Sequence, residues 1–327
     1  MAITVLSRQA AERLVGAATA APSADNAQPW RFVARPADRV IEIYADPART
    51  LRRGDPRGRA VHVACGAALL NLRLAIACSG AEPVARLLPD QRNPLLLAAV
   101  RIAGPYRARR GEQDLYSAIG LASNGSRQPG RPGRPPARGL LPALLEAVAM
   151  EGASLRLLDQ PEALRMLQAL AAADCTAGPA PGRLAELHRF FAGQVRGREA
   201  GGGRAPAWAD VPGGGPQLAL ISTRGDDRVN WLRAGQAMQR LLLLAARRGV
   251  AAAPLTPALE LPQPVLRPDP QLPAGRAEIL VRLGGERGYL PPRRPLAQVL
   301  RFLSQPARPA RAGEAAASGD PELIRSR

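Results

Sequence analysis

Apolar residues recur at helical spacing near the start of the chain and again in two long central segments. In residues 6–20 they fall at Leu6, Ala10 and Leu14, which predicts an amphipathic helix that Ser7 can cap. Pro22 ends this pattern, because the residue before a proline is disfavoured in the α region. The polar stretch APSADNAQPWRF (residues 21–32) follows and leads into a strand-like segment. Its short hydrogen-bonding side chains either cap a turn or hold a ligand.

The two long apolar segments resemble each other. CGAALLNLRLAIACSG (residues 65–80) aligns with AGQAMQRLLLLAARRG (residues 234–249), and both predict buried helices that end at a glycine. Strand-like AAVRIAG (98–104) likewise matches ILVRLGG (279–285), while the flanking segments match more weakly. Each half is expected to run helix, strand, strand, long buried helix, strand. We therefore predict an α+β fold of two fused half-repeats that form a pseudo-dimer, with sheets flanked by helices.

The two halves differ in the connection between their first helix and first strand. The first half has the polar insert PSADNAQPW there, whereas the second has only EGAS at residues 151–154. A simple connection does not need so many residues, which favours a ligand role over a capped turn. We expect one site per chain, at the junction of the halves, where pockets tend to form.

The charge of the chain is unusual but diffuse. Its 327 residues carry a formal net charge of +18, and every basic side chain apart from the histidines is arginine. These arginines are spread from end to end, and aromatic residues make up only 3% of the chain. A specific nucleic-acid surface usually clusters basic and stacking residues, so a coding bias at surface positions explains the pattern better. We expect only salt-sensitive adhesion to polyanions.

Cysteine and histidine usage argues against metal and disulfide chemistry. Cys65, Cys78 and Cys175 form no CxxC pair, and the two histidines, His62 and His188, lie far apart in the sequence. The N-terminus has no signal pattern, and no apolar run reaches the length of a membrane span. These features predict a cytoplasmic protein with no membrane partner.

Several motifs together resemble the nitroreductase superfamily, in its fused-repeat, Acg-like branch of FMN-binding proteins. APSADNAQPWRF matches the family pattern A-P-S-x-x-N-x-Q-P-W-x-F. Two further segments of the first half, DPRGR (residues 55–59) and CGAALLNLRLA, also carry the resemblance. The second half contributes GDDRVNWLRAGQAMQRLLLLAARRGVAAAPLTPALELP and the closing YLPPRRPLAQVL. The resemblance covers most of residues 8–303.

The resemblance implies an FMN site and the residues that form it. Ser23, Asn26 and Gln28 would line the flavin from the first half, and Trp30 would pack at the base of the site. Glu260 and Leu261 would bring a loop backbone near the flavin N5. The basic pair Arg293 and Arg294 would bind the phosphate, a role that guanidinium groups suit well. The flavin would carry the chemistry, so no side chain is expected to act as a catalytic acid or base.

One phosphate-binding motif of the family is altered here. The family pattern R-R-x-T-N-R corresponds to GLASNGSRQPGRPGRP, residues 120–135. Ser123 and Asn124 are retained, but the arginines have become Gly120, Leu121 and Gly125. Arg127 is expected to substitute from a shifted loop, with Arg131 as the other choice. Arg57 and Arg59 either contact phosphate or substrate, or cap the helix that follows.

The expected organisation is an N-terminal half (residues 1–115), a C-terminal half (116–303) and a disordered tail (304–327). An insertion at about 175–215, with Trp208 between glycine runs, is either a hinged lid over the flavin or a mobile surface loop. The halves form the pseudo-dimer within one chain, which allows a monomer.

The expected activity is that of a cytoplasmic FMN-dependent oxidoreductase. Hydride would pass from NAD(P)H through the flavin to an electrophilic small-molecule substrate of the nitroaromatic or quinone type. The first alternative is a flavin-binding or flavin-storage protein with little or no turnover. A second is a degenerate fold that binds no cofactor, for which the altered arginines would be the reason.

Overall fold

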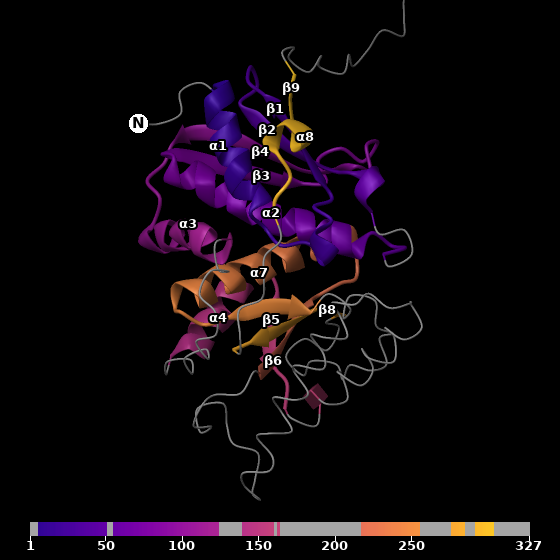
Figure 1. Ribbon diagram of the computed structural model, residues 1–327, viewed down its shortest axis with the longest axis vertical. Coiled ribbons are helices and arrows are strands. Elements are labelled where there is room, and N and C mark those ends of the chain that lie inside the picture. Colours follow the sequence, from indigo (N-terminus) through magenta and orange to yellow (C-terminus); the bar gives the residue numbers. More distant parts are fainter. Residues whose placement is uncertain are drawn as a thin grey trace, which may run out of the picture.

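The structure is a computed structural model that describes residues 6–50, 55–123, 139–159, 162–163, 217–255, 276–284 and 292–303. Its helices and sheets confirm the expected α+β class. Figure 1 shows one sheet at each end of the described part, with two long helices, α2 and α7, between them.

The chain begins with α1 (Arg8–Thr19), as the apolar spacing predicted. Ser7 caps this helix, because its Oγ accepts the backbone N–H of Ala10 at 3.1 Å. The helix buries the side of its surface that carries Ala11 and Val15. It ends three residues before Pro22, with Ala20 as its C-cap, and the polar loop follows.

The first sheet has five strands in the order β3-β4-β2-β1-β9. All neighbours are antiparallel except β1 and β9, which are parallel. Alternate side chains of β1 are fully buried, beginning with Trp30 and Phe32, and they pack in one core with α1 and α2. The strands are β1 (Trp30–Arg35), β2 (Val40–Ala45), β3 (Ala81–Leu87), β4 (Leu96–Pro105) and β9 (Leu300–Phe302).

The second sheet has four antiparallel strands in the order β5-β6-β8-β7. Read from the other edge, β7-β8-β6-β5 follows the same chain order as β3-β4-β2-β1 in the first sheet. The sequence anticipated only one strand after each long helix, whereas the structure has two, because β3 and β7 were missed. The strands are β5 (Ser154–Leu157), β6 (Gln217–Thr223), β7 (Ala252–Leu255) and β8 (Arg276–Leu283).

The long helices α2 (Arg59–Cys78) and α7 (Arg228–Arg247) pack against each other at the centre of the molecule. Gly66 of α2 lies against the backbone of Leu232, and Gly235 of α7 lies against the backbone of Val63. A Cβ at either glycine would overlap the carbonyl oxygen of the facing helix. The two glycines therefore allow backbone-to-backbone approach at the crossing.

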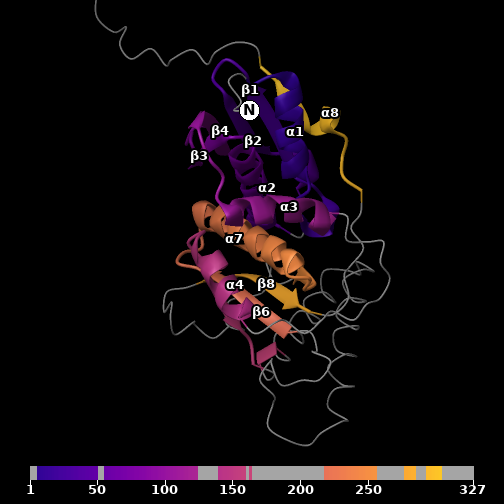
Figure 2. The ribbon, with the colours of Figure 1, turned by 90° about the vertical axis from the view of Figure 1, so that its left-hand side faces the viewer.

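Shorter helices flank this central pair. Figure 2 shows α3 (Arg110–Ser123) beside α7, and α4 (Leu140–Ala149) below α7 beside the second sheet. Contrary to the expectation that no apolar run reaches the length of a membrane span, α2 is long and apolar enough to cross one, and it is alone in this among the described helices. However, 89% of its most apolar 18 residues are buried inside the protein. Such burial is typical of a core helix.

The C-terminal arm, residues 292–303, returns from the second half to the first. It contains the short helix α8 (Leu296–Val299) and β9, which joins the edge of the first sheet beside β1. Figures 1 and 2 show the arm running past α1 at the first-half end of the molecule. The backbone N–H of Leu303 donates to the carbonyl oxygen of Ala34, which closes the pairing.

Candidate functional site

A pocket of about 360 Å³, counting its opening to solvent, lies between the two halves. One wall is the loop after α1 and the N-terminal part of α2, and the other consists of α7, β7 and β8. Among the described residues that line it, Ser23 is the only predicted cofactor-binding residue. The described lining is mostly apolar and consists of Pro22, Ser23, Ala24, Ala60, Val63, Ala64, Met238, Pro254, Leu255 and Ile279.

The polar loop, residues 22–28, has an unusual backbone. Asp25, Asn26 and Gln28 all adopt positive φ, with values of 47°, 53° and 49°. Only glycine adopts this region without cost, so such residues persist where surrounding contacts hold them. One of these contacts is internal, because Ser23 Oγ accepts the backbone N–H of Gln28 at 2.9 Å. This bond agrees with the interpretation of Ser23 as the cap of a turn. Ser23 also lies on the pocket wall, so the structure is compatible with both interpretations.

The other contacts of the polar loop come from the C-terminal arm. The side-chain amides of Asn26 and Gln28 both donate to the carbonyl oxygen of Pro292, at 3.1 and 3.3 Å. Gln28 Oε1 accepts the backbone N–H of Arg294 at 2.8 Å. Gln28 is only 3% exposed. Two of the three polar side chains assigned to the flavin therefore contact the arm.

Arg293 and Arg294 lie beside the polar loop but in different surroundings. Arg293 donates to Asn26 Oδ1 at 2.7 Å and to the carbonyl oxygen of Ala20 at 3.0 Å. It forms no ion pair with a carboxylate among the residues that the structure describes. Burial lowers the pKa of Arg293. Its charge is thus partly desolvated and without an opposite charge in the described part, a setting that favours a bound anion.

Arg294 has a carboxylate beside it. Its Nη1 lies 3.5 Å from Asp46 Oδ2, and it also donates to the carbonyl oxygens of Gln28 and Gln298. Burial and the nearby charge of Arg49 lower the pKa of Arg294, against the influence of Asp46. Asp46 precedes the short helix η2 (Pro47–Arg49), so this contact also ties the arm to the end of β2.

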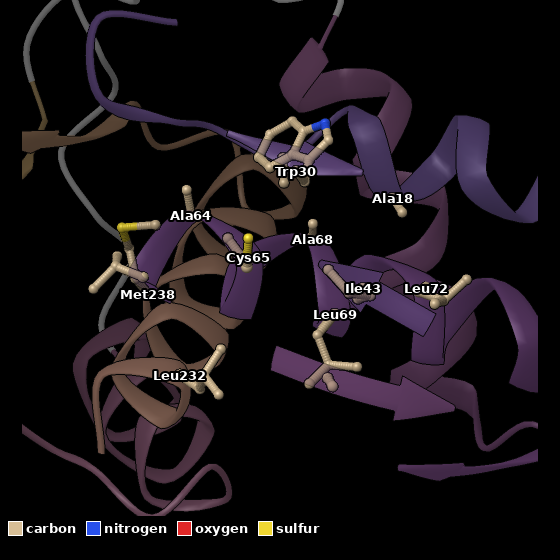
Figure 3. Packing of buried hydrophobic residues seen from close by; sticks show 14 of the residues in the cluster. Ala18, Trp30, Ile43, Ala64, Cys65, Ala68, Leu69, Leu72, Leu232 and Met238 are labelled. Carbon is tan, nitrogen blue, oxygen red and sulfur yellow. The ribbon is translucent and has the colours of Figure 1, made fainter. Parts of the chain in front are cut away.

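Trp30 lies directly behind the polar loop, in the first-half core. Its side chain is fully buried, and Figure 3 shows it over α2, above Cys65 and near Ala68. Cys65 is also buried, and burial alone raises the pKa of its thiol. Such a thiol stays protonated and unreactive. The pair packs behind the polar loop, and Cys65 directly follows the pocket residue Ala64 in α2.

Arg57 and Arg59 contact the second half. Both guanidinium groups bind Asp226, at 2.7 and 2.6 Å, and Trp231 Nε1 donates to the same carboxylate at 2.8 Å. Burial raises the pKa of Asp226, but these donors outweigh it and hold that pKa below its usual value. Gly58, not an arginine side chain, occupies the N-cap of α2. The sequence missed the partner, Asp226, within the motif GDDR.

His62 completes this contact between the N-termini of α2 and α7. Its Nδ1 lies 2.6 Å from the carbonyl oxygen of Gly58, and its Nε2 accepts from Arg228 Nε at 2.9 Å. The ring meets Trp231 edge-on, with centroids 5.4 Å apart. Burial and the charge of Arg228 lower the pKa of His62, although the bond to Gly58 opposes them. His62 is therefore a neutral link between the halves.

Several predicted site residues lie outside the described residues: Asn124, Arg127, Arg131, Glu260, Leu261, the proposed lid at about 175–215 and the tail 304–327. Ser123 is the last residue of α3, and its side chain is also outside the described part. The sequence missed most of the apolar pocket lining, because Val63, Met238 and Ile279 look like ordinary core positions. The one sequence signal that could have indicated this wall is the pair of small side chains Ala60 and Ala64, one turn apart in α2.

Three proteins of Mycobacterium tuberculosis are similar to this chain. One, with the provisional name NAD(P)H nitroreductase Rv3131, is 27% identical over 324 residues, covering 87% of this chain and 89% of that protein. Another, provisionally named NAD(P)H nitroreductase acg, is 33% identical over 97 residues, covering 30% and 29%. The uncharacterized protein Rv3127 is 26% identical over 264 residues, covering 73% and 76%. No protein-family profile matches the chain.

The chain is a relative of the Acg-like nitroreductases. The resemblance inferred from its sequence motifs is thereby confirmed. The alignment with Rv3131 covers most of both chains, so the similarity extends over both halves and not only over the polar loop.

Proposed function

We propose that this protein is an FMN-dependent oxidoreductase that transfers hydride from NAD(P)H to an electrophilic small molecule. The observation that carries the proposal is the pocket between the halves, with Ser23 on its wall and the guanidinium of Arg293, which forms no ion pair with a described carboxylate, beside the same loop. The relatives' names, NAD(P)H nitroreductase, support NAD(P)H as the electron donor and a nitro compound as the acceptor.

The residues present suit a flavin. Small side chains, among them Ala24, Ala60 and Ala64, line the same pocket as the apolar side chains of Met238 and Ile279, and such a lining suits the faces of a planar ring system. Ser23 offers a hydroxyl at the edge of this surface. Arg293 supplies a partly buried cation for a phosphate, and each charge-assisted bond of this kind contributes about 1.5–3 kcal/mol.

The flavin, when bound, supplies the hydride chemistry. The chain then has to bind it, orient it and limit the access of water. Ala60, Val63 and Ala64 of α2 form a stiff wall because α2 is a core helix. Met238 and Leu255 close the opposite side with apolar surface, which disfavours water at the reacting face. No described side chain in the pocket lining is an acid or a base.

The absorption spectrum of purified protein after addition of FMN and removal of the excess tests the proposal. A retained flavin with a shifted visible spectrum, bleached by NADH or NADPH and restored by a quinone, is the expected result. A retained flavin that neither nucleotide bleaches would favour the flavin-storage alternative. A colourless protein would overturn the proposal and favour the cofactor-free alternative.

We also infer that the halves are copies of one unit, fused into a pseudo-dimer with one site. The matching strand orders of the two sheets support this, as do the reciprocal contacts of Gly66 with Leu232 and Gly235 with Val63. The polar loop exists in the first half alone, so one flavin per chain is expected. Flavin content per chain and mass in solution test the stoichiometry and a monomeric state.

A further inference from the structure

Asn26 holds two parts of the C-terminal arm with one side chain. Its Nδ2 donates to the carbonyl oxygen of Pro292 at 3.1 Å, while its Oδ1 accepts from Arg293 Nη1 at 2.7 Å. Both atoms of the amide are thus committed to the arm. Asn26 does not line the pocket, whereas Pro22, Ser23 and Ala24 of the same loop do.

Arg293 bridges the two ends of this pocket-lining stretch. Its Nη1 binds Asn26, and its Nη2 donates to the carbonyl oxygen of Ala20 at 3.0 Å. Because Ala20 and Asn26 flank residues 22–24, the guanidinium spans the base of the loop. Its charge is half-buried and has no carboxylate partner within the described residues. An arginine placed in this way can give its remaining N–H groups to an anion at the mouth of the pocket.

We propose that Asn26 is a positioning residue that acts through Arg293, and that Gln28 anchors the arm which carries this guanidinium. The proposal rests on the proposed flavin function, because the anion that Arg293 meets is taken to be the flavin phosphate. It departs from the sequence expectation, in which Asn26 and Gln28 contact the flavin themselves. Because Asn26 and Gln28 hold the arm that carries Arg293, recognition of the phosphate would depend on the attachment of the arm to the polar loop.

The strained backbone of the polar loop explains why the arm is needed. Asn26 and Gln28 both have positive φ, and neither is a glycine. Such conformations are held only where several contacts determine them. Here these contacts come from a segment more than 260 residues away in sequence, through the Pro292 carbonyl and the Arg294 N–H. Loop and arm therefore order each other.

Binding of FMN and of riboflavin, which lacks the phosphate, tests the role of Asn26. We expect the unaltered protein to prefer FMN, and Arg293→Ala to weaken FMN binding about 10- to 100-fold while riboflavin binding changes less than about twofold. Asn26→Ala should weaken FMN selectively in the same way. The double variant should bind FMN no more weakly than Arg293→Ala alone.

Two further variants make the result specific. Asn26→Asp keeps an acceptor for Arg293 but adds a negative charge beside it, so it should remove the preference for FMN over riboflavin. Arg301→Ala removes an exposed positive charge from the same arm, at β9, and should leave both affinities unchanged. Equal losses of FMN and riboflavin in Asn26→Ala, or multiplied losses in the double variant, would overturn the proposal and indicate direct contact with the flavin ring.

Hydrogen exchange tests the anchoring without any flavin. The backbone N–H of Leu303 bonds to Ala34, so its exchange reports the attachment of the arm. Asn26→Ala and Gln28→Ala should each speed this exchange about 2- to 10-fold, and Arg301→Ala should not. Unchanged exchange in both loop variants would refute the anchoring. If the unaltered protein bound neither FMN nor riboflavin, the proposed function would fail, and this exchange experiment would still decide whether the loop holds the arm.

Discussion

Gly66 of α2 and Gly235 of α7 occupy corresponding places where the two long helices cross. Each lies against the backbone of the other helix, at Leu232 and Val63 respectively. These two glycines are also aligned with each other in the sequence comparison of the halves. The closest approach of the helices therefore depends on two positions that carry no side chain.

Gly66→Ala should destabilise the protein. Although alanine favours a helix by about 0.5–1 kcal/mol over glycine, the new methyl group would overlap the Leu232 carbonyl, and overpacking costs about 1–3 kcal/mol or more. Gly235→Ala should cost a similar amount. Urea denaturation gives both values. Gly16→Ala in α1 is the matched control, because nothing lies within 4 Å of its added methyl group, and it should stabilise.

Asp226→Asn should loosen the contact between the N-termini of α2 and α7. The substitution removes the negative charge that Arg57 and Arg59 share, and we expect a loss of about 1.5–3 kcal/mol in unfolding free energy. Asp114→Asn removes the more exposed pair with Arg247 and should cost less than about 1 kcal/mol. Equal effects of the two variants in chemical denaturation would contradict this ranking.

Stability should fall on acidification because of His62. Its pKa is lowered in the folded protein, so the unfolded chain binds a proton that the folded chain resists. The free energy of unfolding should therefore decrease as pH falls below about 7, through the usual histidine pKa of about 6.5, until the folded pKa is also passed. Denaturation at a series of pH values should show this slope.

His62→Gln should flatten that part of the profile. A slope that survives His62→Gln would mean that another group causes the pH dependence.

A large side chain on the pocket wall should block flavin binding. Ala24 lines the pocket from the polar loop and is only partly buried, so Ala24→Trp can fill the space without entering the core. We expect FMN affinity to fall at least about tenfold with little change in melting temperature. Ala48→Trp, at an exposed position of η2, is the control. Normal FMN binding by Ala24→Trp would place the flavin elsewhere.

Local patterns were sufficient for α1 and the two long central helices. The spacing of Leu6, Ala10 and Leu14 predicted α1, and Ser7 caps it as expected. The longer apolar segments predicted α2 and α7, which are buried at the centre. Strand β7 was missed because it has only four residues, and β3 because it contains Pro83 and the charged residues Glu82 and Arg86.

The sequence by itself determined the first helix, the two long helices, the similarity of the halves, the family resemblance and the position of the polar loop. These follow from residue spacing and short motifs, in which the relevant neighbours are close along the chain. Only the tertiary structure decided what Asn26, Gln28, Arg57 and Arg59 contact. Their partners are Pro292, Arg293, Arg294 and Asp226, and each bond joins residues separated by more than 160 positions in the sequence. Periodicity cannot identify such partners, because they depend on how the C-terminal arm and the two central helices pack.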